Sequence, residues 1–181
     1  DNDFVNEHHL SRHCIGLSGM GFTDAEIEQL AGRIRKMKET GTHLCCSIGF
    51  LTEKQAKMLK DAGLDRINHN LNSSQNYYHN ICSTHTFEQR VANIKMLQEL
   101  GFEICSGGII GMGESKEDVV DMLLELREIQ PEALPINFLL PIPGTPLANA
   151  DLSVLTTAYC MKVLCLARLL VPQSDIRCAA G

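Results

Sequence analysis

The chain has 181 residues, of which 44% are hydrophobic, and this length is sufficient for one domain with a sizeable core. Its formal net charge of -6 at pH 7, without a cluster of Lys and Arg, argues against a nucleic-acid partner. No apolar run is long enough to span a membrane, and residues 1–3 have no signal-peptide character, so we expect a cytoplasmic protein with no membrane partner.

Helices are predicted by a pattern that repeats along the chain: a capping residue, an amphipathic segment and then Gly or Pro. Capping boxes at Thr23, Thr52 and Thr86 begin the first three helices, and Gly41, Gly63 and Gly101 end them. Two more helices are expected, one from Ser115 to Pro131 and one over residues 154–170. A longer loop is expected around residues 75–85.

Strands are predicted near residues 14, 45, 68, 105, 137 and 177, and the one near 105 covers residues 104–110. Strict alternation of strands and helices indicates right-handed βαβ units and a parallel sheet. Such a sheet is either doubly wound or closed as a barrel. The first strand-to-helix turn has no glycine-rich dinucleotide fingerprint, and polar or sulfur residues lie on nearly every strand, which favours a (β/α)8 TIM-type barrel.

About six of the eight barrel strands are present in this prediction. An incomplete barrel has two exposed strand edges. We therefore expect residues 1–181 to be a single α/β barrel domain truncated at both ends, that is, a fragment of a longer chain.

Three asparagines share one face of the predicted strand over residues 66–74: Asn68, Asn70 and Asn72. The other face carries Ile67, His69 and Leu71. Asparagine is poor strand material because its side chain competes for backbone hydrogen bonds. The row indicates either a site for a polar, uncharged ligand or a short edge strand that faces solvent.

Eight cysteines at scattered spacings indicate reduced thiols or metal ligands rather than a disulfide framework. Cys14, Cys45 and Cys105 lie on strands that the pattern buries, and Arg177 lies on the last strand. Side chains from several strands meet inside a barrel, so these four residues are candidates to hold an iron–sulfur cluster. The alternative is that the cysteines are small hydrophobic core residues.

Residues 68–74, residues 104–114, and residues 135–137 with 144–147 closely resemble the biotin synthase family of radical S-adenosylmethionine enzymes. The similarity extends over Arg12-His13-Cys14, over Cys45 with Gly49, and over Arg177 with Gly181. It implies a (β/α)8 barrel with two clusters. One is a 4Fe-4S cluster that binds S-adenosylmethionine, and the other is a 2Fe-2S cluster whose ligands here would be Cys14, Cys45, Cys105 and Arg177.

The activity implied by this resemblance is radical insertion of sulfur into dethiobiotin to form biotin. Asn68, Asn70 and Asn137 match positions that bind the ureido ring of dethiobiotin or the cofactor's ribose, and Asn72 matches a ribose-binding position. No side chain is expected to act as a general acid or base, because the cofactors carry the difficult steps. The resemblance also implies a homodimer and an electron donor such as flavodoxin or ferredoxin.

The sequence departs from the family in lacking the CxxxCxxC motif that ligates the 4Fe-4S cluster. We expect that motif upstream of Asp1, so the chain alone is expected to be inactive. Two alternatives stay open: a catalytically inert truncated product, or another radical S-adenosylmethionine barrel enzyme. The remaining cysteines are expected to be ordinary thiols: Cys46, Cys82, Cys160, Cys165 and Cys178.

Overall fold

The computed structural model describes residue 4, residues 7–8 and residues 10–180. The chain divides into two compact units. Unit 1 comprises Asp1–His69 and Ala92–Ile104, and unit 2 comprises Asn70–Val91 and Cys105–Gly181. None of the helices in the described part of the chain is both long and apolar enough to cross a membrane.

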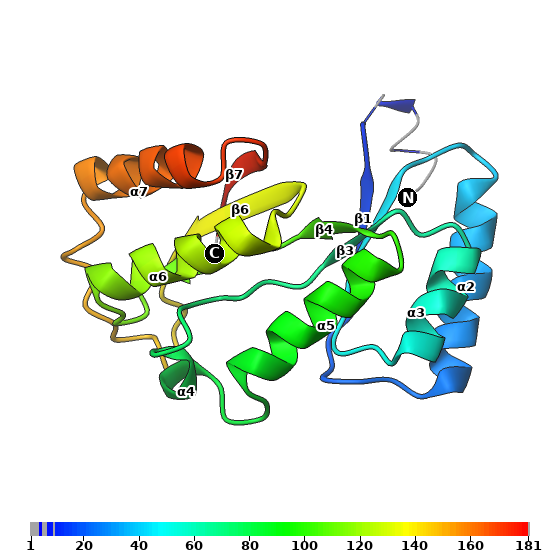
Figure 1. The fold of residues 1–181 in the computed structure, drawn as a ribbon, viewed down its shortest axis with the longest axis horizontal. Helices are drawn as coiled ribbons and strands as arrows, with labels where there is room; N and C mark the ends of the chain where they lie inside the picture. Colours follow the sequence, from blue (N-terminus) through cyan, green and yellow to red (C-terminus); the bar gives the residue numbers. More distant parts are fainter. Residues whose placement is uncertain (1–3, 5–6, 9, 181) are drawn as a thin grey trace. The chain divides into compact units, whose positions relative to one another are not determined.

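The first segment of unit 1, Asp1–His69, has three described strands in chain order: β1 (His13–Gly16), β2 (Leu44–Ser47) and β3 (Arg66–Asn68). β2 lies between the other two, and both pairings are parallel. The helices α2 (Asp24–Lys38) and α3 (Glu53–Asp61) connect these strands and pack side by side (Figure 1). This arrangement of parallel strands joined by helices is the predicted βαβ pattern.

The helix boundaries of unit 1 follow from local sequence. Thr23 and Thr52 cap α2 and α3 in reciprocal capping boxes with Glu26 and Gln55, as predicted. The apolar face of α2 is buried at Ile27, Leu30 and Ile34, as its amphipathic pattern indicates. The third predicted helix is α5 (Phe87–Glu99), which begins in the Asn70–Val91 segment of unit 2, and there Thr86 and Gln89 exchange the same hydrogen bonds.

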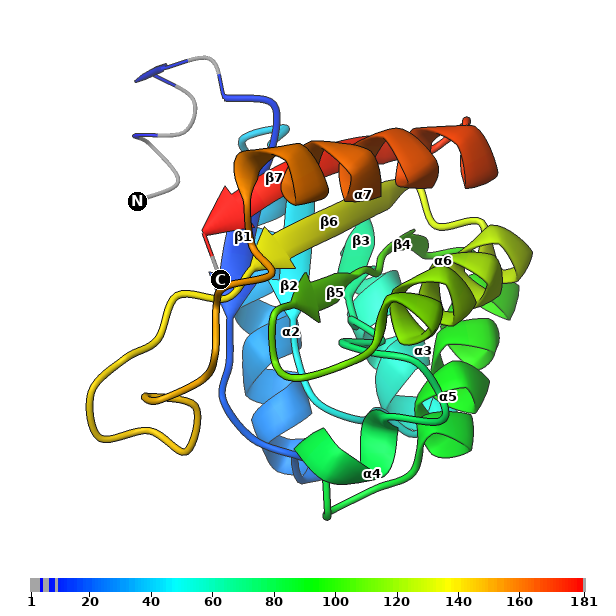
Figure 2. The same ribbon diagram turned by 90° about the vertical axis from the view of Figure 1, so that its left-hand side faces the viewer.

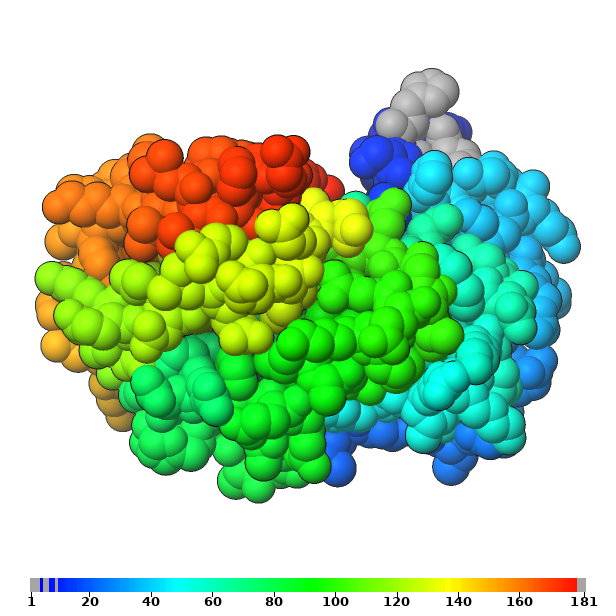
Figure 3. All heavy atoms as spheres, in the orientation of Figure 1, coloured from blue at the N-terminus to red at the C-terminus, as the bar shows by residue number. Residues whose placement is uncertain are grey.

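Unit 2 has β6 (Ala133–Phe138) at the centre of its parallel strands. On one side β6 pairs with the end of β4 (Glu103–Cys105) and with β5 (Gly108–Ile110), and it also pairs with β7 (Asp175–Ala180). The helix α7 (Thr157–Leu170) packs on β7 (Figure 2) and lies beside α6 (Lys116–Ile129), with which it forms a continuous surface (Figure 3).

The single strand predicted over residues 104–110 is divided into β4 and β5, so the described chain has seven strands rather than six. Both pieces keep the same register against β6, with Cys105 opposite Ala133 and Gly108 opposite Ile136. The amide of Ser106 donates to the carbonyl of Ala133, and the next bond of a parallel ladder would come from the amide of Pro135. Proline has no amide hydrogen, so the ladder stops there.

A second correction concerns the predicted loop around residues 75–85, which contains the short helix α4 (Tyr78–Ile81). Tyr78 is buried, and its ring contacts those of His85 and Phe87 edge to face. This aromatic packing depends on residues outside the helix, and helical periodicity cannot reveal it in so short a segment. Among the described residues, β1 pairs only with β2 and β7 only with β6, so each unit ends on an open strand edge.

Candidate functional site

Two of the predicted cluster ligands lie side by side on neighbouring strands of unit 1. Cys14 on β1 lies opposite Cys45 on β2, and Cys45 lies opposite Arg66 on β3. Residues in register on parallel strands project their side chains from the same face, so these three side chains form a row. Cys45 is buried as predicted, whereas Cys14 is exposed because β1 is the edge strand of the unit.

Arg66 belongs to a charge cluster of three residues. Oε2 of Glu103 accepts hydrogen bonds from Nε of Arg66 at 2.9 Å and from Nη2 of Arg12 at 2.9 Å, and it lies 2.7 Å from Nη2 of Arg66. The side chain of Arg66 is only 9% exposed and that of Arg12 is 16% exposed. Nη1 of both arginines is buried and has no hydrogen-bond partner among the described residues.

The chemistry of this face suits an anionic iron–sulfur group. Thiolates of Cys14 and Cys45 are the ligand type that such clusters require. Two guanidinium groups with one carboxylate leave an excess of one positive charge, and buried charge is normally compensated. Within the described part of the chain, no group of three or more Cys, His, Asp or Glu side chains lies close enough together to hold a metal ion.

The asparagine segment alternates in burial as predicted, although β3 covers only its first three residues. Ile67, His69 and Leu71 are at most 2% exposed, whereas Asn68, Asn70 and Asn72 are partly exposed. Asn68 ends β3 opposite Ser47. The regular strand does not continue to Ser74, because Asn72 has a φ of 71° and forms only an isolated bridge with Gly108.

In unit 2 the segment of Asn70 and Asn72 is tied to the Ser106-Gly107-Gly108 turn. Oδ1 of Asn70 accepts a hydrogen bond from the amide of Gly107 at 3.1 Å. The amide of Asn72 donates to the carbonyl of Gly107, and its carbonyl accepts from the amide of Ile109, both at 3.0 Å. The side chain of Asn70 therefore has a structural role that the sequence analysis did not foresee.

Asn137 lies on β6 opposite Ile109 of β5. Its Oδ1 is buried, and none of the described residues donates a hydrogen bond to it. Oγ of Ser106 is likewise buried without a partner among those residues. Because buried polar atoms in native proteins are nearly always bonded, these two atoms suit a ligand that offers both donors and acceptors.

The other two predicted cluster ligands, Cys105 and Arg177, belong to unit 2. Cys105 is 8% exposed and ends β4. Arg177 on β7 is not buried as predicted, since its side chain is 47% exposed. Its Nη2 lies 2.6 Å from Oδ2 of Asp175, two residues earlier on the same face. The exposure follows from the open edge of β7.

Glu114, to which no sequence motif assigns a role, organises the loop of Gly111, Met112 and Gly113 after β5. Its carboxylate accepts hydrogen bonds from the amides of Gly111 at 2.7 Å and Met112 at 2.8 Å. The hydroxyl of Tyr77 donates to the carbonyl of Met112 at 3.0 Å. Met112 also borders an apolar pocket of about 370 Å³, whose other lining residues are Asn80, Ile81, Leu139, Leu140, Ile142, Thr145, Pro146 and Leu147.

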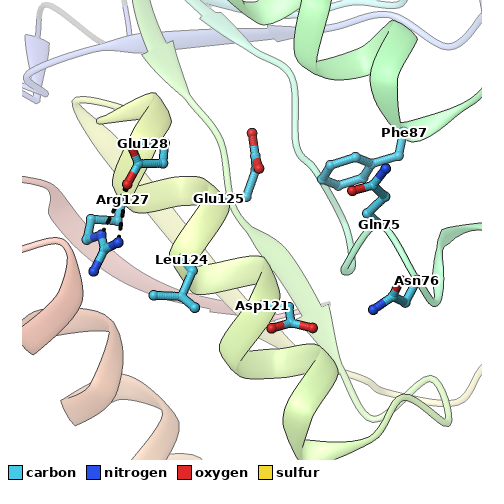
Figure 4. A pocket seen from close by; sticks show the side chains of 8 residues that line it. All are labelled: Gln75, Asn76, Phe87, Asp121, Leu124, Glu125, Arg127 and Glu128. Carbon is cyan, nitrogen blue, oxygen red and sulfur yellow. Dashed lines mark hydrogen bonds and ion pairs between the residues drawn. The ribbon is translucent and has the colours of Figure 1, made fainter.

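Another pocket of unit 2, of about 260 Å³, contains no predicted site residue (Figure 4). Asp121 and Glu125 enter it from α6, opposite Gln75 and Phe87. Its other lining residues are Asn76, Leu124, Arg127 and Glu128. The predicted cluster and substrate sites consist of cysteine, arginine and asparagine side chains, whereas this pocket is lined by carboxylates. We therefore do not assign this pocket to either predicted site.

The model of the Radical SAM superfamily matches residues 5–126. The chain belongs to this superfamily. The model of the Biotin and Thiamin Synthesis associated domain matches residues 135–181. Biotin synthase of Sulfurihydrogenibium sp. (strain YO3AOP1) is 44% identical over 172 residues, which is 94% of this chain and 51% of the relative. Biotin synthase of Bacillus subtilis (strain 168) is 42% identical over 173 residues, 95% of this chain and 51% of the relative.

The chain therefore spans about half the length of the curated relatives it matches, and its resemblance to biotin synthases is confirmed. Among solved structures, methylornithine synthase superposes with a TM-score of 0.80 at 19% identity, covering 97% of this chain and 53% of that one. The [FeFe]-hydrogenase maturase HydG of Carboxydothermus hydrogenoformans gives 0.73 at 16% identity, covering 97% and 44%. The predicted fold class, the α/β TIM-type fold of radical SAM proteins, is confirmed.

Proposed function

We propose that this chain is the central part of a biotin synthase, which inserts sulfur into dethiobiotin. The observation that carries the proposal is similarity at 41–44% identity to curated biotin synthases over almost the whole chain. The match to the Biotin and Thiamin Synthesis associated domain supports the same choice over other radical SAM barrels. The likeness to methylornithine synthase and HydG supports the fold alone.

The substrate proposed for the amide side chains is the neutral ureido ring of dethiobiotin, together with the ribose of S-adenosylmethionine. We assign Asn68, Asn70 and Asn137 to the ring or the ribose and Asn72 to the ribose. An amide offers a donor and an acceptor, as do a urea and a sugar hydroxyl. The buried Oδ1 of Asn137 supports this assignment, because it has no partner among the described residues.

The ligands proposed for a 2Fe-2S cluster are Cys14, Cys45, Cys105 and Arg177. When bound, the cofactors supply a 5′-deoxyadenosyl radical, made with a 4Fe-4S cluster and S-adenosylmethionine, and the sulfur that replaces two hydrogens of the substrate. The protein's own task is to fix the substrate carbons, to supply thiolates and to exclude water. No residue is assigned as a general acid or base.

The chain by itself is proposed to be inactive. Its 181 residues contain no CxxxCxxC motif, and this is the observation that favours an inert product as the second candidate. Generation of the radical therefore needs ligands that these residues do not include. For the whole enzyme we propose a homodimer and an electron donor such as flavodoxin or ferredoxin.

The proposal is tested by anaerobic reconstitution of the 181-residue chain with iron and sulfide. We expect one 2Fe-2S cluster per chain by iron and sulfide analysis and by visible absorption, and no biotin from dethiobiotin. Cys45→Ser is expected to abolish the cluster, whereas Cys165→Ser, an exposed thiol on α7, serves as the matched control. Biotin formed by this chain alone contradicts the proposed inactivity, and an equal cluster yield in both variants contradicts the ligand assignment.

Dethiobiotin binding separates biotin synthase from other radical SAM barrels. Calorimetric titration of the reconstituted chain with dethiobiotin and S-adenosylmethionine is expected to give saturable heat with dethiobiotin. Biotin precursors lacking the ureido ring, such as diaminopelargonic acid, provide the control. Equal binding of the two compounds would remove the support for an amide-lined ureido site.

A further inference from the structure

The charge cluster of unit 1 has an unused hydrogen-bond donor. Arg66 directs Nε and Nη2 to one oxygen of Glu103, so this edge of its planar guanidinium group is occupied. Nη1 is the remaining nitrogen of the group, and it is buried with no hydrogen-bond partner among the described residues. A buried cationic donor without an acceptor is costly, which indicates that an acceptor is bound there in the working protein.

The net charge at this place has the sign that an anion requires. Arg12 and Arg66 share the single carboxylate of Glu103. The side chain of Arg66 is only 9% exposed. Surface arginines lose little by standing unpaired, but a guanidinium group in this position is poorly compensated by water. The cluster therefore favours a ligand that carries negative charge.

The register of the strands places Arg66 beside the candidate thiolates. Its Cα is the partner of Cys45, which is in turn the partner of Cys14, so the three side chains leave the same face of β1, β2 and β3. The short β3 begins at Arg66, and Glu103 begins β4. Glu103 thus fixes the guanidinium group of a residue that begins β3 and lies in register with Cys45 on the neighbouring strand.

We propose that Arg66, fixed by Glu103, is a positioning residue that donates a hydrogen bond from Nη1 to a sulfur atom of the anionic iron–sulfur group held by Cys14 and Cys45. This inference rests on the proposed function, and it concerns a residue outside the proposed ligand set. A cationic N–H donor at a cluster sulfur stabilises the more negative, reduced form and raises the reduction potential. It also strengthens retention of the cluster.

The test uses the full chain reconstituted anaerobically with iron and sulfide, in wild type, Arg66→Met and Arg66→Lys. Arg66→Met keeps most of the apolar stem and removes the donor. Arg66→Lys keeps the positive charge, but an ammonium group lacks the planar, fixed donors that let a guanidinium group bind Glu103 and a sulfur atom at once. Arg35→Gln is the matched control, because Arg35 is a half-exposed arginine of the same unit whose pair with Glu28 lies on the surface of α2.

We expect Arg66→Met to shift the reduction potential of the cluster to more negative values in spectroelectrochemical titration. Loss of iron to a chelator is expected to become easier by about ten- to a hundredfold, the usual effect of removing a partner of a metal-site ligand. Arg66→Lys is expected to lie between wild type and Arg66→Met. Arg35→Gln is expected to match wild type in both measurements.

The possible failures are distinguishable. If wild type binds no cluster, the proposed ligand set fails, and the inference about Arg66 fails with it. If wild type binds a cluster whose potential and chelator resistance are the same in Arg66→Met, Arg66→Lys and Arg35→Gln, only the role of Arg66 is overturned. Should Arg66→Met not fold, as judged by circular dichroism, Arg66→Lys and Glu103→Gln decide by the same two readouts.

Discussion

The thiol of Cys82 lies 3.4 Å from Nδ1 of His85, at the turn that precedes α5. Nε2 of the same ring lies 2.6 Å from Nη2 of Arg90, which can only donate, so the ring proton is placed on Nδ1, facing the sulfur. Burial opposes ionisation of Cys82, but hydrogen bonds from Thr84 and the amide of His85, with the charge of Arg90, lower its pKa. These contacts distinguish Cys82 among the five cysteines to which the sequence assigns no ligand role.

Cys82 is expected to react with iodoacetamide at neutral pH before the buried Cys46. Burial, with a contribution from Cys14, raises the pKa of Cys46 to about 12, so Cys46 carries almost no thiolate there. The rate at Cys82 should fall only as the pH drops through its lowered pKa. Thr84→Val removes a hydrogen-bond donor and should move this profile to higher pH, whereas the exposed Ser83→Ala should not. Peptide mapping by mass spectrometry measures the labelling of Cys82 and Cys46 in wild type and in each variant. Equal labelling of Cys82 and Cys46 would contradict the lowered pKa of Cys82.

Gly107 is expected to tolerate no side chain. A Cβ built on it would lie 1.8 Å from the carbonyl oxygen of Pro135, which is backbone and cannot move aside. Gly107→Ala should lower the free energy of unfolding by about 3 kcal/mol or more. Gly32→Ala is the control, because Gly32 lies inside α2 with open space around it, and it should stabilise by about 0.5–1 kcal/mol. Urea unfolding of Gly107→Ala and Gly32→Ala measures the two free energies of unfolding. Equal changes in the two variants would contradict the steric requirement for glycine at position 107.

Asp65 is expected to make the stability of the chain depend on pH. Burial raises its pKa, but the amide of Leu44 at 2.7 Å and the ammonium group of Lys38 at 3.0 Å outweigh burial and lower it below 3.8. A lowered folded pKa means that the contribution is complete above the unfolded pKa and is lost as the pH falls through the folded pKa. Asp65→Asn should cost about 1 kcal/mol at pH 7 and less near pH 3.

The measurement is urea unfolding at pH 7 and pH 3. Asp61→Asn, an exposed position on α3, is the control and should follow wild type at both pH values. A cost of Asp65→Asn that is the same at both pH values would show that the charge of Asp65 contributes nothing.

Asn137→Leu is expected to separate stability from binding. Replacing a buried acceptor that has no partner among the described residues should leave the free energy of unfolding unchanged or raise it by up to about 1 kcal/mol. Dethiobiotin binding should fall at least tenfold in calorimetric titration. Asn93→Leu is the matched control, because the Asn93 amide group donates to the carbonyl of Leu51 at 2.8 Å and its loss should destabilise the fold. Undiminished dethiobiotin affinity in Asn137→Leu would exclude Asn137 from the site.

Arg177→Ala is expected to alter the visible spectrum of the reconstituted cluster more than it alters folding. The described ion pair of Arg177 is with Asp175 of the same strand, at a half-exposed position, and such pairs contribute about 0–1 kcal/mol. Arg168→Ala, on α7, is the control and should leave the spectrum unchanged. An unchanged spectrum in Arg177→Ala would remove it from the ligand set.

The helices were predictable because their signals are local. Thr23, Thr52 and Ser115 each exchange hydrogen bonds with a residue three positions later, so four residues suffice to specify the start of a helix. The parallel strands followed from alternation with these helices. The assignment of Cys14, Cys45, Cys105 and Arg177 as cluster ligands required in addition the resemblance to a known family, and it stays a prediction.

The errors of prediction have long-range causes. The break between β4 and β5 depends on Pro135, which lies on another strand and removes one amide from the ladder. The exposure of Cys14 and Arg177 depends on which strands have neighbours on both sides, and strand periodicity does not report that. The bond from Gly107 to Asn70 joins residues 37 positions apart, so no local motif indicates it.

Glu103 contacts Arg66 across 37 positions and Arg12 across 91 positions. The segment that contains it, Ala92–Ile104, belongs to unit 1 but follows the first part of unit 2 in the chain. During synthesis, unit 1 is therefore complete only after residue 104 has left the ribosome, by which time Asn70–Val91 has already emerged without its own partners. Contacts of such sequence separation slow folding, so assembly of the arginine cluster is expected to be a late step.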